Sequence, residues 1–196
     1  MGDQSEQKDE ELASQIQSGR IEFFSMLMGR YETKILRYAS KFLYNPEDAK
    51  DAVQDIFTKA YMNIKSFDVR RKFSPWLYRL AHNELINLLD KRRIRTFVPL
   101  PDLDIFLPNF SRNNVAEHID RQEYQKIVDT CLDKLESKYK EPVILFYLEE
   151  LSYKEIAQIM QIPVSTVGIR INRAKKLMKI IFEKSRSFDR GSSYPR

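Results

Sequence analysis

The most regular feature of the sequence is a run of apolar residues from Ala49 to Ile64. They recur at alternating steps of three and one: Ala49, Ala52, Val53, Ile56, Phe57, Ala60, Tyr61 and Ile64. This spacing places them on one face of an α-helix for about five turns. Asn45 and Pro46 precede the run, and an Asn cap followed by proline at the first helical position is a strong helix start. The run therefore predicts an amphipathic helix with one buried face.

A second amphipathic helix is predicted from Ser74 to Arg95, with Ser74 as its cap and Pro75 at the first helical position. Its apolar face would hold Trp76, Leu77, Leu80, Ala81, Leu85, Leu88 and Leu89, and its polar face Arg79, His82, Asn83, Glu84 and Asn87. The helix ends in Lys91, Arg92, Arg93 and Arg95. Such a polar face suits a phosphate backbone, and an ordinary solvated surface has the same composition.

Helical spacing also occurs at 23–43, 117–135 and 139–149, whereas no stretch alternates as a half-buried strand does. Only five of the 196 residues are glycine. We therefore expect an all-α fold of two small helical domains, each with its own core. The boundaries follow from breaks in the pattern: an acidic N-terminal segment at 1–20, a first domain at 21–95, a flexible linker at 96–116 containing three prolines, a second domain at 117–184 and a disordered tail at 185–196.

Charge is unevenly distributed along the chain. Residues 1–20 carry five acids and two bases, whereas residues 70–95 and 152–186 each carry eight bases and two acids. Two separate basic patches indicate two contacts with one long polyanion, most simply nucleic acid. No apolar run approaches the roughly 18 residues of a membrane span, and the N-terminus is acidic where a signal peptide would be basic. We expect a cytoplasmic protein without membrane insertion.

The exposed face of the helix around Ala49–Ile64 carries Asp51, Gln54 and Asp55. Like charges four residues apart destabilise a helix by roughly 0.2 to 0.5 kcal/mol, so a cationic partner would explain them. A solvated acidic face is the alternative. The single cysteine, Cys131, excludes an intrachain disulfide and a cysteine-cluster zinc site, and it falls on an apolar stripe as a small core residue.

Residues 152–179 form the sharpest local motif. Ser152 and Glu155 have the spacing of a capping box, and Gln161 to Pro163 would form a turn before a second helix. That second helix would expose Ser165, Thr166, Ile169, Arg170, Asn172, Arg173 and Lys176. The arrangement predicts a DNA-binding helix-turn-helix, with a structural helical hairpin as the alternative. Because glycine is usual at the position of Gln161, we expect Gln161 to be left-handed, at a cost of about 1 kcal/mol.

Three segments together resemble the extracytoplasmic-function sigma factors of bacterial RNA polymerase: DAKDAVQDIFTKAY at 48–61, FSPWLYRLAHN at 73–83 and LSYKEIAQIMQIPVSTVGIRINRAKK at 151–176. The resemblance covers nearly all of residues 10–182. It implies two helical domains, called regions two and four. Region two would bind the clamp helices of core polymerase and melt the minus-ten element, and region four would contact the flap and sit in the major groove of the minus-thirty-five element. It also implies nucleoid association within the holoenzyme and, as such factors often have, an anti-sigma partner.

Site residues follow from the same resemblance. Asp51, Gln54 and Asp55 match the surface that binds core polymerase, with Asp55 standing where glutamate is commoner. The pocket for a base flipped out of the non-template strand corresponds to Asn63, Phe67, Leu80 and Asn83, beneath a loop that includes Arg70, Arg71 and Lys72. Aromatic and amide groups suit such a pocket, because an aromatic covers a base face and an amide reads its edge.

In the recognition helix, the resemblance assigns Arg170 and Arg173 to DNA-facing positions and Ser165 and Thr166 to the phosphate-contacting N-terminus. Gly168 and Ile169 depart from the basic and hydroxyl residues usual there, so the base sequence that this helix reads is left open.

Two other functions compete with a sigma factor. A helix-turn-helix transcriptional regulator would bind DNA without joining polymerase, but it would leave Asp51 and Asp55 unexplained. An enzyme would need a catalytic constellation, and the chain offers two distant histidines, no phosphate-cradling glycine loop and no convergent carboxylate pair. We expect no catalytic residue, metal or cofactor.

Overall fold

The computed structural model describes residues 7–93 and 121–191, and these form helices without a strand. The first bundle consists of α1 (Asp9–Gln17), α2 (Phe24–Ser40), α3 (Pro46–Asn63) and α4 (Phe73–Arg93), with 3₁₀ turns at Ile21–Phe23 and Ile64–Ser66. The second consists of α5 (Arg121–Asp133), α6 (Ser137–Tyr147), α7 (Tyr153–Met160) and α8 (Val164–Gly191). The predicted all-α fold is confirmed. The expected linker lies outside the described residues.

Helix α3 starts where the sequence predicts. The Oδ1 of Asn45 accepts a hydrogen bond from the backbone N–H of Glu47 at 3.0 Å, and Pro46 is the first helical residue. The apolar face is buried at Ala49, Ala52, Val53, Ile56, Phe57, Ala60 and Ile64, whereas Tyr61 is exposed. Local signals, a cap and a stripe, therefore determine this helix.

Helix α4 differs from the prediction at its start. It begins at Phe73, so Ser74 is a helical residue and its assignment as the cap is wrong. The first N–H, that of Phe73, donates instead to Glu10 Oε1 of α1 at 2.9 Å. A carboxylate from another helix satisfies one of the amides that a helix start leaves unpaired. Helix α1 therefore belongs to the first bundle, although the sequence placed it in a separate acidic segment.

The polar face of α4 is also less exposed than expected. Arg79, Asn83 and Asn87 are exposed, but His82 and Glu84 are 8% and 7% exposed. Glu84 forms an ion pair with Lys59 of α3, and His82 contacts Glu141 of α6. Helix α4 therefore has neighbours on more than one side.

The helix-turn-helix has the predicted local geometry. The hydroxyl of Ser152 accepts from the Glu155 amide while the Glu155 carboxylate accepts from the Ser152 amide, which confirms the capping box. Gln161 is left-handed with φ 54°, as expected. Helix α8 continues to Gly191, so residues 185–191 are helical where we expected a disordered tail.

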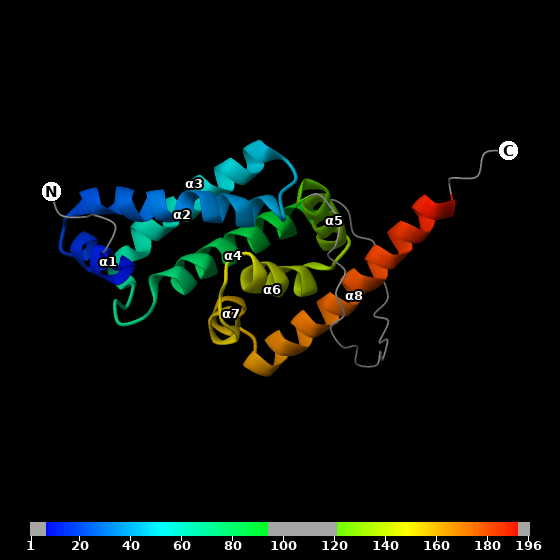
Figure 1. The fold of residues 1–196 in the computed structure, drawn as a ribbon. Helices are drawn as coiled ribbons and strands as arrows, with labels where there is room; N and C mark the ends of the chain where they lie inside the picture. Colours follow the sequence, from blue (N-terminus) through cyan, green and yellow to red (C-terminus); the bar gives the residue numbers. More distant parts are fainter. Residues whose placement is uncertain (1–6, 94–120, 192–196) are drawn as a thin grey trace.

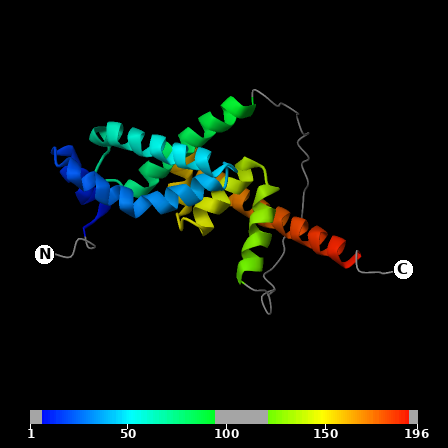
Figure 2. The same cartoon turned by 90° about the horizontal axis from the view of Figure 1, so that it is seen from above.

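Figure 1 shows α4 running between α2 and α3 on one side and α6 and α7 on the other, with the C-terminal part of α8 projecting away. Figure 2 shows the same molecule from above, with the second bundle set against one end of the first. Buried side chains of both bundles form one continuous apolar cluster rather than two separate cores. In the described part of the chain, no helix has the length and apolar character needed to cross a membrane.

The loop between α6 and α7 offers a test of backbone strain. Glu150 is exposed and has φ 56°, which costs a residue with a Cβ about 1 kcal/mol. We expect Glu150→Gly to raise the free energy of unfolding by up to about 1 kcal/mol in urea denaturation. Glu150→Gln keeps the Cβ and removes the charge, so it should leave stability unchanged. Equal effects of both substitutions would attribute the gain to charge instead of conformation.

Candidate nucleic-acid and polymerase interface

The acidic face of α3 is open to solvent. Asp51, Gln54 and Asp55 are all exposed, on the side of α3 opposite the buried Ala52 and Ile56. Within the described residues, neither Asp51 nor Asp55 has an ion-pair partner. The structure therefore presents two uncompensated carboxylates one helical turn apart.

The loop before α4 presents exposed basic side chains. Arg70 binds Asp68 through two bonds, from Nε to Oδ1 at 2.9 Å and from Nη2 to Oδ2 at 3.0 Å. Hydrogen bonds from Arg70 lower the pKa of Asp68 to about 2, so the pair is charged at neutral pH. Arg71 is also exposed, and Lys72 reaches Glu155 of α7 at 2.9 Å. The loop thus carries three exposed cationic side chains.

The residues predicted for the base pocket do not all line an open surface. Phe67 is 5% exposed, and its ring centroid lies 5.5 Å from that of Phe73 and 5.1 Å from that of Trp76. Leu80 is half-buried, and Asn63 and Asn83 are exposed. The amide of Asn63 donates to the carbonyl of Lys59 at 2.8 Å. Phe67 is therefore a buried member of an aromatic cluster, and Asn83 is one of the polar residues of α4 that face solvent.

The recognition helix α8 divides its predicted DNA-facing residues between two environments. Ser165, Ile169 and Asn172 are exposed, whereas Thr166, Arg170, Arg173 and Lys176 are half-buried. The guanidinium of Arg173 lies 5.5 Å from the ring centroid of Tyr139 in α6, a cation–π contact. Arg173 is thus held against α6 and does not lie on the most exposed face of α8.

A groove of about 710 Å³ lies between the two bundles. Arg170 of α8 lines it together with Phe42 and Tyr44 after α2 and Ile86 and Asp90 of α4. Sequence reasoning missed the groove because its walls come from segments far apart in the chain. No group of His, Cys, Asp and Glu side chains that could hold a metal ion occurs among the described residues.

Both bundles match known protein families. Sigma-70 region 2 matches residues 27–94, and Sigma-70, region 4, matches residues 125–178. The ECF RNA polymerase sigma factor SigW of Bacillus subtilis is 32% identical over 171 residues, which cover 84% of this chain and 91% of SigW. This chain belongs to the ECF sigma factors. The sigma-E factor of Escherichia coli K12 is 34% identical over 176 residues, covering 86% of this chain and 91% of that protein.

Solved structures of sigma factors have the same fold. CnrH, in complex with the cytosolic domain of CnrY, is 26% identical with a TM-score of 0.68, covering 90% of this ECF sigma factor and 97% of CnrH. RpoE of Bartonella quintana, in complex with the anti-sigma factor NepR, has a TM-score of 0.63 at 20% identity and covers 82% and 96% of the two chains. This protein therefore acts as a sigma factor, which binds core RNA polymerase and directs it to promoters, as the sequence predicted.

The Arg70–Asp68 pair can be tested by titration. We expect Arg70→Ala to raise the pKa of Asp68 from about 2 toward its ordinary value of 3.8, measured from carboxyl carbon shifts by NMR. Arg71→Ala is the matched control, because the Nε of Arg71 lies 3.9 Å from Asp68 Oδ2. Its removal should therefore shift the pKa of Asp68 less than Arg70→Ala does. Since the folded pKa is lowered, the pair stabilises the loop above about pH 4 and is lost as the pH falls toward 2. Equal shifts in both variants would contradict the geometry.

Proposed function

We propose that this ECF sigma factor divides initiation among three surfaces: the acidic face of α3 for core polymerase, the loop and exposed edge of α4 for the minus-ten element, and α8 for the minus-thirty-five element. It works in the cytoplasm, at the nucleoid when bound to polymerase, and makes or breaks no covalent bond itself. The exposed carboxylates of Asp51 and Asp55, which have no ion-pair partner in the described part of the chain, carry the proposal, because a regulator that only binds DNA has no use for them.

Electrostatics supports the assignment of α3. Carboxylates at i and i+4 repel each other, at a cost of roughly 0.2 to 0.5 kcal/mol in a helix. Basic groups on the clamp helices of polymerase would turn this cost into attraction. Gln54 lies between Asp51 and Asp55 on the same exposed face and can donate and accept hydrogen bonds there.

The proposed minus-ten surface combines cationic side chains with amide groups that can hydrogen-bond to a base edge. Arg70, Arg71 and Lys72 would hold the phosphates of the melted strand, which positions DNA without reading its sequence. A flipped base would meet Leu80 and the amides of Asn63 and Asn83, whose donor and acceptor atoms match a base edge. Phe67 supports this pocket from below, because its ring is already enclosed by Phe73 and Trp76.

On α8, the N-terminal hydroxyls of Ser165 and Thr166 would contact phosphate, and Ile169 and Asn172 would face base edges. Arg170 would reach DNA only after it leaves the groove between the bundles, and Arg173 only after it leaves the ring of Tyr139. Lys176 would contact the backbone. We also propose an anti-sigma partner, since Bartonella RpoE was solved with the anti-sigma factor NepR and CnrH with the cytosolic domain of CnrY.

Core binding is tested by charge reversal. Asp51→Lys with Asp55→Lys should abolish co-elution with core polymerase, because attraction at both positions becomes repulsion. Glu22→Lys with Glu32→Lys makes the same charge change at exposed positions before and within α2, and should leave co-elution intact. Circular dichroism confirms that both variants fold. Loss of binding in both variants would attribute it to net charge, and retention in both would remove α3 from the interface.

Promoter melting is tested with two asparagines one helical turn apart on α4. Asn83→Ala should reduce permanganate reactivity of the melted strand more than it reduces closed-complex formation, because a flipped-base pocket acts only on open DNA. Asn87→Ala removes an equally exposed amide outside the proposed pocket and should change neither measurement. If Asn83→Ala lowers both measurements by the same factor, Asn83 does not read a flipped base.

A further inference from the structure

Helix α1 bonds to the backbone at both ends of the loop before α4. We call the segment from Phe67 to Phe73 the minus-ten loop. Near the end of α1, the Nε2 of Gln17 donates to the carbonyl of Ile64, just before the loop, at 2.7 Å and to the carbonyl of Phe67 at 2.8 Å. At the start of α1, the Oε1 of Glu10 accepts from the backbone N–H of Phe73 at 2.9 Å. One helix therefore holds the loop where it begins and where it ends.

The two side chains lie on one face of α1. Gln17 follows Glu10 by seven residues, which is close to two helical turns, so both project to the same side about 10 Å apart along the axis. The six peptide steps from Phe67 to Phe73 would span about 20 Å in an extended chain. The ring centroids of Phe67 and Phe73 instead lie 5.5 Å apart. Helix α1 thus bonds to a bent loop and keeps its two ends at a fixed spacing.

The position of α1 is set by contacts outside the loop. Leu12 and Ala13 are fully buried in the first bundle. The carboxylate of Asp9 accepts from the Tyr31 hydroxyl of α2 at 2.5 Å and from the Nη1 of Arg30 at 2.6 Å. Burial and these bonds to α2 fix α1, so α1 can serve as a rigid support for the loop.

Other bonds of the loop are made in its middle. Arg70 binds the carboxylate of Asp68, and the backbone N–H of Arg71 donates to the Asp68 carbonyl at 2.9 Å. Lys72 reaches Glu155 of α7. The bonds of Asp68 give the loop a local turn but do not fix its ends. The bonds from α1 do so, and they therefore determine where the turn lies relative to α4.

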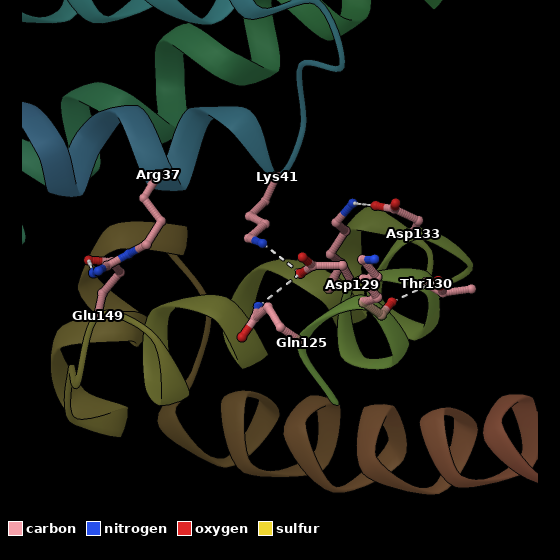
Figure 3. Close-up of polar contacts among 9 residues, drawn as sticks. Arg37, Lys41, Gln125, Asp129, Thr130, Asp133 and Glu149 are labelled. Atoms are coloured by element: carbon pink, nitrogen blue, oxygen red, sulfur yellow. Dashed lines mark hydrogen bonds and ion pairs between the residues drawn. The ribbon is translucent and has the colours of Figure 1, made fainter. Parts of the chain in front are cut away.

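The ion pairs that join α2 to the second bundle are separate from α1. Figure 3 shows Arg37 and Lys41 pointing from α2 toward the second bundle. Arg37 pairs there with Glu149, after α6, at 2.8 Å, and Lys41 pairs with Asp129 of α5 at 2.6 Å. In the described part of the chain, no side chain of α1 forms a hydrogen bond or an ion pair with the second bundle. A substitution in α1 therefore leaves these pairs in place.

We propose that α1 takes part in promoter opening, with Gln17 and Glu10 as positioning residues that hold the minus-ten loop in the shape that receives the melted strand. This consequence rests on the proposed minus-ten surface, whereas the order of the loop is measurable without DNA or polymerase. A loop that is already ordered loses less conformational freedom when it binds the strand. The bonds from α1 therefore favour the open complex and leave core binding and the closed complex unaffected.

Gln17→Leu tests the bonds at the first end of the loop. Leucine keeps a side chain of similar size and removes both donors. NMR relaxation of the full-length free protein should give amide order parameters of about 0.85 at residues 68–72 in the parent protein and below about 0.6 in Gln17→Leu. Gln15→Leu is the matched control on the same helix, because the Oε1 of Gln15 is buried and has no hydrogen-bond partner among the described residues. This control should keep the loop ordered.

Glu10 allows rescue by a conservative variant. Glu10→Ala removes the acceptor for the Phe73 amide and should loosen the loop. Glu10→Gln keeps an oxygen acceptor and should leave the loop as ordered as in the parent protein. Equal loosening by alanine and glutamine would assign the effect to charge and overturn the role of this bond. Equal loosening by Gln15→Leu and Gln17→Leu would overturn the proposal, because general destabilisation of α1 would then be the cause.

Promoter opening is measured on the same variants with core polymerase. Gln17→Leu should lower permanganate reactivity of the melted strand about fivefold or more, a factor that corresponds to one net hydrogen bond, and leave closed-complex formation unchanged. Opening at the parent's level, or a parent loop that is already disordered, would overturn the proposal. If the parent protein opens no promoter of a genomic library while Gln17→Leu loosens the loop, the positioning by α1 stands and the proposed minus-ten function is wrong.

Discussion

The two-sided packing of α4 is the constraint on which most of the structure depends. Leu77, Ala81 and Leu85 are buried in the first bundle, while Tyr78 and His82 bond to carboxylates of the second. Tyr38 of α2 bonds to the same Glu141 carboxylate as His82. Burial together with the charge and hydrogen bond of Glu141 raises the pKa of the Tyr38 phenol well above its ordinary value, so Tyr38 stays a neutral hydrogen-bond donor. Packing therefore leaves α4 a narrow exposed edge, which carries Arg79, Asn83 and Asn87 and limits where DNA can be read.

Features encoded within a few residues could be predicted from the sequence. The start of α3 needs only Asn45, Pro46 and an apolar stripe, and the capping box needs only Ser152 and Glu155. The start of α4 depends instead on Glu10, which lies 63 residues away in the chain. Likewise, His82 is buried by a partner 59 residues away. Helical periodicity describes one helix at a time and cannot identify a second neighbour on its polar face.

The candidate sites show the same division. Residue type and the family resemblance identified Asp51 and Asp55, because an exposed acidic face is a property of one helix. They did not predict the packing of Phe67 against Phe73 and Trp76 or of Arg173 over Tyr139. The buried stripe of α8, which includes Val167, Ile171 and Ala174, leaves two flanks, and only tertiary packing decides which flank faces α6.

Two pairs of carboxylates in this protein lie in different environments, one pair exposed on α3 and the other enclosed between the bundles. Asp51 and Asp55 are exposed and have no ion-pair partner among the described residues, so binding a cationic partner would offset their repulsion. Glu141 and Glu149 are enclosed by donors, but separation of the bundles would return each donor and acceptor to water, so each bond to these charged groups contributes only about 1.5 to 3 kcal/mol net. Together such bonds amount to several kcal/mol, within the range that differential binding of a partner can supply. A wholly apolar interface of the same extent would be costlier to open, because its exposed surface gains no hydrogen bonds from water. The contact between the bundles is therefore mixed, because buried side chains of both bundles form one apolar cluster and the polar bonds of Glu141 and Glu149 lie beside it.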